Sequence, residues 1–424
     1  MSTVLQPFRP DASSPWDADA AAHLWRRAGF GASPARIEAT VRLDPQEAAR
    51  SLVEGPARDS AAEGLESIFG AVVGSSDDDK ARAWLVSRMI RCEHQLREKV
   101  ALFWHGHFAT SIAKVRDLGW MMRQYRIFLE EGLGRFPALL ARVARDPAML
   151  RWLDNETNSK GHPNENFARE LFELFTLGVG NYGEQDIQEA ARAFTGWHIL
   201  QDEYRFSKAL HDEGEKTVFG KRGRFGGDDV LALALEHPAC SRFLARKLLD
   251  FFVMPVPAGA ASEEVESVAR LLRDTGYDIG ATLRALFGSQ LFYGSAARRS
   301  LVKSPLDYFV GAARSLEMPA DATAAVPLLR EMGQDLLSPP NVKGWPGHGA
   351  WINTATWITR VNAAERIAAT LEIGFDGEQA LDHYGRALLG RPPPAAERQA
   401  LLSAGTGKRD LVHGLLALPE AHLL

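Results

Sequence analysis

The sequence predicts a mainly α-helical protein, a large multi-helix body that carries one small β-hairpin or irregular insertion. Apolar residues recur at helical spacing through most of the 424 residues. Capping residues, prolines and glycines divide this pattern into helices of ordinary length. One stretch differs: residues 198–229 contain glycines at 214, 220, 223, 226 and 227, with only short apolar pieces between them. Such a stretch is typical of hairpins and irregular loops.

The first half of the chain is predicted to be helical almost throughout. Ala20, Ala21 and Leu24 place one apolar face on a first helix, which ends before Gly29. Ser33 precedes Pro34, and this pair favours the start of a second helix because proline needs no N–H partner there. Further helices are expected over residues 79–105 and, in two segments, over 127–152.

The second half is predicted to resume the helical pattern after the insertion. Helices are expected over residues 230–253, 263–275, 279–287, 306–316, 355–371 and 378–389, and from 395 onward. A long Trp-rich loop, SPPNVKGWPGHGAWIN, precedes residue 355. The expected organisation is a flexible segment 1–16, a helical core 17–197 with the polar motif, the insertion 198–229, a second helical part 230–371, and a helical appendage 372–424.

Composition and charge exclude several classes of protein. The chain is 46% hydrophobic and 24% charged, which is ordinary for a globular protein. Its formal charge is −5, so it has no basic field for nucleic acid. No apolar run is long enough to span a bilayer. The N-terminus lacks the pattern of a secretory signal, and only two cysteines occur, so we expect a cytoplasmic location.

The segment His162–Trp197 carries the most polar chemistry. Glu170 and Glu173 lie one turn apart on a predicted helix, and Asp186 and Glu189 do so on the next. A short connection makes these helices antiparallel neighbours. The four carboxylates are therefore expected to converge.

Two histidines precede this segment in the motif FWHGHF. His105 and His107 would lie about 200° apart on a continuous helix, so they face one point only if the helix unwinds at Gly106. Imidazoles beside carboxylates suit Zn, Mn or non-haem Fe. The alternative is that these histidines simply close a helix, whose dipole favours a cation at that end.

Two further regions provide candidate substrate-binding residues. His211, Asp212 and Lys216 lie in the glycine-rich insertion, and Lys343 and Trp345 lie in the Trp-rich loop. The Trp side chains of this loop either form a ligand platform or anchor the loop to the body. The run GEKTVFGKRGRFGG lacks the spacing of a phosphate-binding loop, so no nucleotide cofactor is expected.

Several long motifs, taken in order, resemble one known family. They are HLWRRAGFG, FWHGHF, PNENFARELFELFTLGVGNY, DIQEAARAFTGW, HDEGEKTVFG, VKSP and GQDLLSPPNVKGW. The resemblance is to the bacterial domain of unknown function 1800. It implies no assigned activity, but its members are often encoded beside a family that looks like the alkaline phosphatase and sulfatase superfamily. A protein of that kind is therefore an expected partner. Members are also often secreted, whereas this sequence shows no export signal.

Two functional hypotheses follow. The first is a metal-dependent hydrolase in which His105, His107, Glu170 and Glu173 hold the ion, and Asp186 or Glu189 is the general base on a metal-bound water. The second is a non-catalytic accessory or binding subunit. In that case the charged helix faces form a structural ion-pair network, with Arg169 and Arg192 as counterions.

Overall fold

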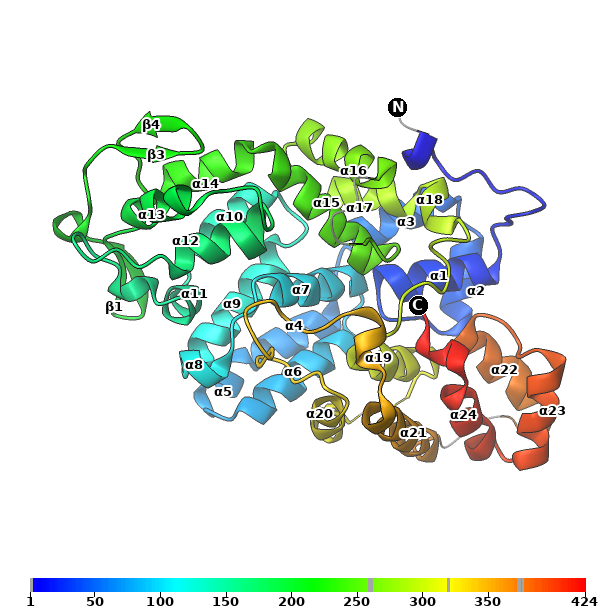
Figure 1. Cartoon of the computed structure of the whole chain (residues 1–424). Coiled ribbons are helices and arrows are strands. Elements are labelled where there is room, and N and C mark those ends of the chain that lie inside the picture. The colour runs from blue at the N-terminus through cyan, green and yellow to red at the C-terminus, as the bar shows by residue number, and fades with distance from the viewer. Residues whose placement is uncertain (1–2, 258–261, 319–320, 372–374, 376) are drawn as a thin grey trace.

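Helices form most of the structure, as the sequence predicts. The computed structural model describes residues 3–257, 262–318, 321–371, 375 and 377–424 (Figure 1). Within these residues the strands form two small antiparallel sheets of two strands each. The mainly α fold with a small β insertion is therefore confirmed.

The N-terminal helices begin at aspartates. Asp17, Asp44, Asp59 and Asp77 each accept a hydrogen bond from a backbone N–H of the helix that follows, which satisfies donors that have no partner inside the helix. Ser33 precedes a helix as predicted, but its side chain makes no capping bond. The elements are η1 (Thr3–Leu5), α1 (Ala18–Ala28), α2 (Pro34–Val41), α3 (Pro45–Glu54), α4 (Ser60–Ser67), α5 (Phe69–Gly74) and α6 (Asp78–Arg91).

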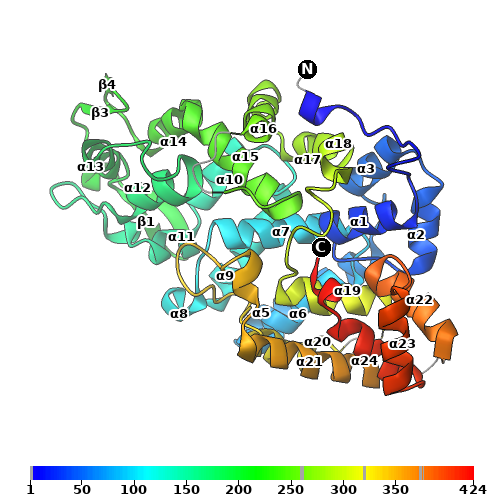
Figure 2. The ribbon, with the colours of Figure 1, turned by 45° about the vertical axis from the view of Figure 1, so that its right-hand side comes forward.

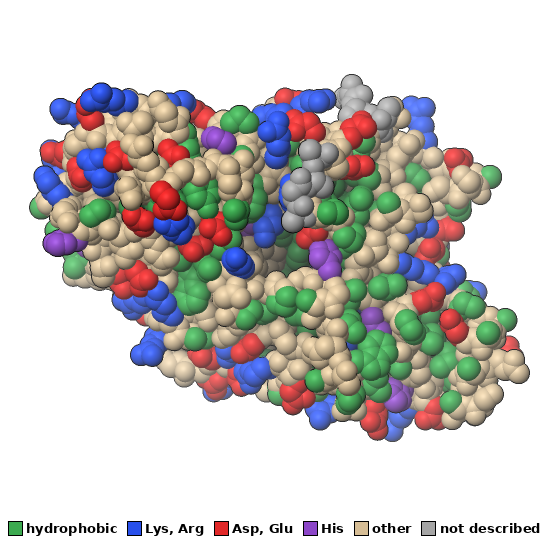
Figure 3. All heavy atoms as spheres, viewed as in Figure 1, with side chains coloured by type: hydrophobic (Ala, Val, Ile, Leu, Met, Phe, Trp, Pro, Cys, Tyr) green, Lys and Arg blue, Asp and Glu red, His purple; other side chains and the backbone are tan. Residues whose placement is uncertain are grey.

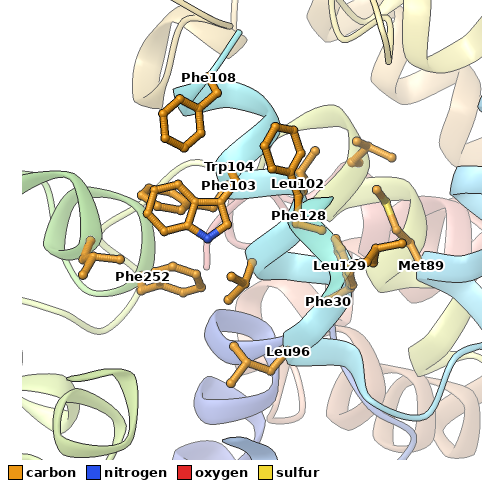
Figure 4. Packing of buried hydrophobic residues seen from close by; sticks show 14 of the residues in the cluster. Phe30, Met89, Leu96, Leu102, Phe103, Trp104, Phe108, Phe128, Leu129 and Phe252 are labelled. Carbon is orange, nitrogen blue, oxygen red and sulfur yellow. The ribbon is translucent and has the colours of Figure 1, made fainter. Parts of the chain in front are cut away.

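Helix α7 (Gln95–His107) runs through the middle of the molecule and is buried along almost all of its length. The single helix expected over residues 79–105 is in fact α6 and α7, separated by Cys92–His94. Leu96, Leu102, Phe103, Trp104 and Phe108 pack with side chains of neighbouring helices (Figure 4). The helices that follow are α8 (Ile112–Val115), α9 (Leu118–Glu131), α10 (Phe136–Ala144) and α11 (Pro147–Trp152).

The predicted polar helix widens into a π-helix. After η2 (Asn155–Thr157), α12 (Asn166–Glu170) continues as π-helical residues Leu171–Thr176, labelled η3, and α13 (Glu184–Ala193) follows. The insertion contains two hairpins, β1 (Trp197–Leu200) with β2 (Glu203–Phe206), and β3 (Lys216–Val218) with β4 (Lys221–Gly223), separated by η4 (Lys208–Leu210). These hairpins lie at one end of the molecule (Figure 1).

The remaining helices return along the body and end at its opposite side. They are α14 (Gly227–Glu236), α15 (Pro238–Phe252), α16 (Glu263–Asp274), α17 (Ile279–Phe287), α18 (Gln290–Tyr293), α19 (Pro305–Ser315), α20 (Ala322–Glu331), η5 (His348–Trp351), α21 (Thr354–Ala369), α22 (Gly377–Leu389), α23 (Ala395–Ala404), α24 (Lys408–Ala417) and η6 (Pro419–His422). The last residues come back to the middle of the molecule, near α1 and α19 (Figure 2). Among the described residues, no helix is both long and apolar enough to cross a membrane.

Candidate functional site

A cavity of about 270 Å³ opens between α7, α15, the start of α19 and the Trp-rich loop. We call it the lysine cavity because Lys99, Lys247 and Lys343 line it. In the space-filling view, basic side chains and a histidine border a hollow near the centre of the visible face (Figure 3). Aromatic, polar and aliphatic residues complete its wall, among them Phe103, His107, Asp250, Phe251, Ser304, Asp307, Gln334, Trp345, His348, Trp351 and Leu424.

Lys99 forms a buried ion pair with Asp307 at the cavity wall. Asp307 also accepts a hydrogen bond of 2.8 Å from the Ser304 hydroxyl, which caps α19. Burial lowers the pKa of Lys99, and the carboxylate of Asp307 opposes that shift. Lys99 is therefore committed to a partner within the protein.

Lys247 has no such partner. Among the described residues, no hydrogen bond or ion pair within the usual distances joins its Nζ to another group, although Nζ lies 5.9 Å from the centre of the Phe243 ring. Burial lowers the pKa of Lys247, and the negative charge of Asp250 raises it by a smaller amount. Its ammonium group is thus available to a ligand.

Asp250 and His348 form a pair on the same wall. His348 Nε2 lies 2.9 Å from Asp250 Oδ2, and Asp250 Oδ1 accepts a hydrogen bond of 2.9 Å from the backbone N–H of Val256. The hydrogen bond to Asp250 raises the pKa of His348, while burial lowers it. His348 also has a φ of 55°, a conformation that side chains other than glycine adopt rarely.

His107 presents a neutral imidazole to the cavity. Its Nε2 lies 3.1 Å from the carbonyl oxygen of Phe175, so this nitrogen carries the proton and donates it. Burial, and next the positive charge of Lys247, lower the pKa of His107 to about 3. Nδ1 is buried without a hydrogen-bond partner among the described residues. It therefore offers a free lone pair.

Buried cations near Asp307 outnumber the carboxylates that line the cavity. Arg27, Lys303 and Arg360 are buried within electrostatic reach of Asp307. Among described groups, Nε and Nη1 of Arg27 have no hydrogen-bond partner. Burial and the surrounding cations lower the pKa of Lys303 to about 7. Among the described residues, the acidic side chains that line the cavity are those of Asp250 and Asp307.

The two histidines predicted as metal ligands point to different surroundings. Helix α7 stays continuous through Gly106, so the expected unwinding does not occur. His105 Nε2 accepts a hydrogen bond of 3.1 Å from the backbone N–H of Leu337, and its ring packs against Trp345. The lone pair of His105 that a metal would need is therefore already used.

Glu170 and Glu173 do lie together, as predicted. Both are half-buried, and burial with the negative charge of Glu173 raises the pKa of Glu170, while Lys343 opposes this shift. The hydroxyl of Tyr182 donates to Glu173 Oε2 at 3.0 Å. Glu170 therefore lies within electrostatic reach of Lys343, which lines the lysine cavity.

Asp186 and Glu189 instead hold the second hairpin. Asp186 caps α13 by accepting from Gly183 N–H and also accepts from the N–H of Phe219 at 2.7 Å. Glu189 pairs with Arg192 and accepts from the N–H of Thr217 at 2.9 Å. One face of α13 therefore holds the backbone of β3 and the turn that follows it.

The predicted residues of the insertion bind one another. Asp212 pairs with Arg192 at 2.8 Å, and this pairing lowers the pKa of Asp212 to about 2. Lys216 donates to the backbone carbonyls of Asp212 and Gly214, and His211 Nδ1 lies 2.8 Å from the carbonyl of Thr195. None of the three lines the lysine cavity.

Lys343 and Trp345 do line the cavity. The glycine between them packs against α7: Gly344 has a φ of 84°, and a Cβ there would lie 2.3 Å from the Gly106 carbonyl oxygen. Only glycine fits this approach. The Trp-rich loop is therefore seated on α7 directly beside His105 and His107.

The predicted metal ligands do not fit a metal in this arrangement. Among the described residues, the side chains of His, Cys, Asp and Glu form no group of three or more that could hold an ion. Glu170 and Glu173 remain a carboxylate pair without the imidazoles.

Sequence reasoning did not identify Arg27, Lys99, Lys247, Asp250 and Asp307 as site residues. The sequence holds two indications of this site. Lys99 is a charged residue within an apolar helical stretch, which favours a buried ion pair. The segment SPLD at 304–307 has the spacing of a capping box, whose acidic residue can also pair with a cation. The partners themselves come from distant parts of the sequence.

Comparison with known proteins identifies the family. A family model described as "Protein of unknown function (DUF1800)" matches residues 23–423, nearly the whole chain. No curated protein and no solved structure matches the sequence. The chain therefore belongs to the DUF1800 family.

Proposed function

We propose that this protein binds a small anionic molecule in the lysine cavity. The observation that carries the proposal is the excess of cations: three lysines line the cavity, and Arg27, Lys303 and Arg360 lie behind it, with fewer carboxylates to balance them. Buried cations without a full set of partners are costly. A bound anion would supply the missing partners.

The rest of the wall supports a ligand of limited size. The cavity volume of about 270 Å³ lies just below the range of about 300–1,000 Å³ for pockets of drug-sized ligands. Phe103, Phe251, Trp345 and Trp351 line it, and charge interactions are stronger beside such apolar walls than in bulk water. These features favour a compact carboxylate or phosphate compound.

This proposal corresponds to the binding role among the two sequence hypotheses. The hydrolase hypothesis remains a prediction whose four metal ligands do not come together. A cytoplasmic location and a partner resembling the alkaline phosphatase and sulfatase superfamily remain part of the proposal. Such hydrolases release anions, which is the class of ligand that this cavity favours.

Malonate is a suitable probe because it is a compact dianion without a reactive carbonyl. We expect calorimetry to show saturable one-site binding that weakens moderately as salt is added, because dissolved ions screen free malonate and the exposed Lys343. Lys247→Met and Lys343→Met should each weaken malonate binding at least tenfold. Lys221→Met is the matched control, because Lys221 lies on the surface and pairs with Glu236.

Two results would overturn the proposal. One is that neither malonate nor inorganic phosphate binds saturably. The other is that Lys221→Met weakens binding as much as the cavity variants do. Circular dichroism of each variant shows whether it is folded, and Lys343, being exposed, provides a variant with little effect on folding.

A further inference from the structure

The three lysines of the cavity have different environments. Lys99 is held by Asp307, and Lys343 is exposed at the rim. Lys247 is partly buried one helical turn before Asp250, beside the ring of Phe243, and its Nζ has no hydrogen-bond or ion-pair partner among the described residues. Among the described residues, Lys247 is therefore the cavity lysine that combines partial burial with a nitrogen not committed to the protein.

The surroundings of Lys247 make its neutral form more accessible than that of an exposed lysine. Burial lowers the pKa of this group, and the imidazole of His107 in the same cavity is held neutral. Desolvated lysines near other cations are the ones that act as nucleophiles, because only the neutral amine has a lone pair. The other two lysines lack this combination of partial burial and a free nitrogen.

The same wall contains a hydrogen-bond acceptor, His107, and a histidine, His348, that can exchange a proton. His107 Nδ1 has an unused lone pair, and its other nitrogen is fixed by the Phe175 carbonyl. His348 is oriented by Asp250 at 2.9 Å. An amine that adds to a carbonyl must lose a proton, and the oxygen that leaves must gain one.

We propose that Lys247 forms an imine with a small aldehyde or ketone that carries a carboxylate. This inference rests on the proposed function, since the carboxylate occupies the anion site made by the neighbouring cations. The neutral Nζ attacks the carbonyl carbon, a C–N bond forms, and the electrons of the C=O π bond move to oxygen. A proton passes from nitrogen to oxygen to give a carbinolamine. A second proton passes from nitrogen to the hydroxyl oxygen as the C–O bond breaks, water leaves, and the nitrogen lone pair forms the C=N bond, so no oxidant or reductant is needed.

The imine can be trapped in the full-length protein. Glyoxylate, which has both an aldehyde and a carboxylate, is added at neutral pH with cyanoborohydride, which reduces an imine to a stable carboxymethyl-amine. Peptide mapping by mass spectrometry then locates the modified lysines. We expect Lys247 to be modified at least tenfold faster than the exposed Lys221 and Lys343 in the same digest, and malonate to protect Lys247 selectively.

Lys247→Arg is the informative variant because it keeps the positive charge but cannot form this imine. We expect it to lose the rapid modification, whatever its affinity for malonate. The inference is overturned if Lys247 is modified no faster than the exposed lysines, or if malonate gives it no protection. The comparison among lysines is made in the protein without any substitution, so it remains valid even if Lys247→Arg fails to fold.

The two proposals fail in different ways. If malonate does not bind, the proposed function is wrong. If malonate binds but Lys247 is not preferentially modified, the imine is wrong and the anion-binding role stands.

Discussion

At the scale of single residues, the site depends on buried charges that the protein only partly neutralises. Lys99 and Asp307 compensate each other, and the Ser304 hydroxyl adds a hydrogen bond to the carboxylate. Lys247, Arg27 and His107 retain atoms without partners among the described residues. Buried polar atoms without a partner are costly, and a ligand in the cavity would reduce that cost at Lys247 and His107.

Removing one partner of the Lys99–Asp307 pair should destabilise the protein strongly. Asp307→Asn leaves a buried ammonium without its counterion, and we expect the free energy of unfolding to fall by about 3–5 kcal/mol. Urea denaturation measures this change. Glu236→Gln, which breaks an exposed pair with Lys221, should change stability by less than about 1 kcal/mol. An equal fall in the free energy of unfolding in the two variants would contradict the conclusion that Lys99 and Asp307 form a buried ion pair.

At the scale of elements, the predicted polar residues divide into two groups with different roles. Asp186 and Glu189 join α13 to β3 and the turn after it through backbone hydrogen bonds, and Arg192 joins the same helix to Asp212. The insertion is thereby fastened to the helical body. The sequence predicted that these helix faces carry concentrated charge, but only the packing shows that backbone amides are their partners.

The Trp-rich loop is the element whose position decides the shape of the cavity. Gly344→Ala places a Cβ 2.3 Å from the Gly106 carbonyl oxygen at a φ of 84°, so the loop must lift from α7. We expect weaker malonate binding and faster amide hydrogen exchange in residues 343–351. Gly349→Ala is the control, because a Cβ there meets no atom within 4 Å, and it should leave both measurements unchanged. A normal affinity in Gly344→Ala would show that loop seating does not shape the site.

At the scale of the whole molecule, helices from distant parts of the chain meet around α7. Lys99 and Asp307 are 208 residues apart, and Asp250 and His348 are 98 residues apart. The chain end returns to the same region, where Leu424 N–H donates to the Leu301 carbonyl. The cavity is therefore a product of the complete fold.

Global stability should fall in mild acid because several histidines are buried in neutral form. Burial lowers the pKa of His105, His107 and His422 to about 3, whereas unfolded histidines titrate near 6.5. The unfolded chain therefore binds more protons between these values, and stability is lost as pH falls from about 6.5 towards 3. Each histidine contributes up to about 1.4 kcal/mol per pH unit. Asp146, whose pKa burial raises to about 7, opposes part of this loss.

Urea denaturation at pH 7, 6 and 5 tests this expectation. His107→Gln should make the free energy of unfolding less dependent on pH. His162→Gln, at an exposed position, should leave the dependence as it is in the natural sequence. A pH profile that His107→Gln does not flatten would contradict the neutral, buried state of His107.

The sequence by itself determined that the chain is mainly helical, where the glycine-rich insertion interrupts the helices, and which family the motifs resemble, although the helices predicted over 79–105 and 230–253 are each two helices in the structure. Caps, breakers and apolar spacing act between residues a few positions apart, so they can be read along the chain. Helix α17, predicted over residues 279–287, has those bounds in the structure. Lys343 and Trp345 were also singled out from the sequence, and both line the cavity.

Only the tertiary structure decided which polar residues share a site. It separates His105 from His107 by keeping α7 helical, assigns Asp186 and Glu189 to the hairpin, and brings Lys247, Asp250 and His348 to one wall. The physical reason is that desolvation and pairing depend on groups far apart in the sequence. Local spacing shows which side chains share a helix face, but packing decides whether that face meets water, backbone amides or a cavity.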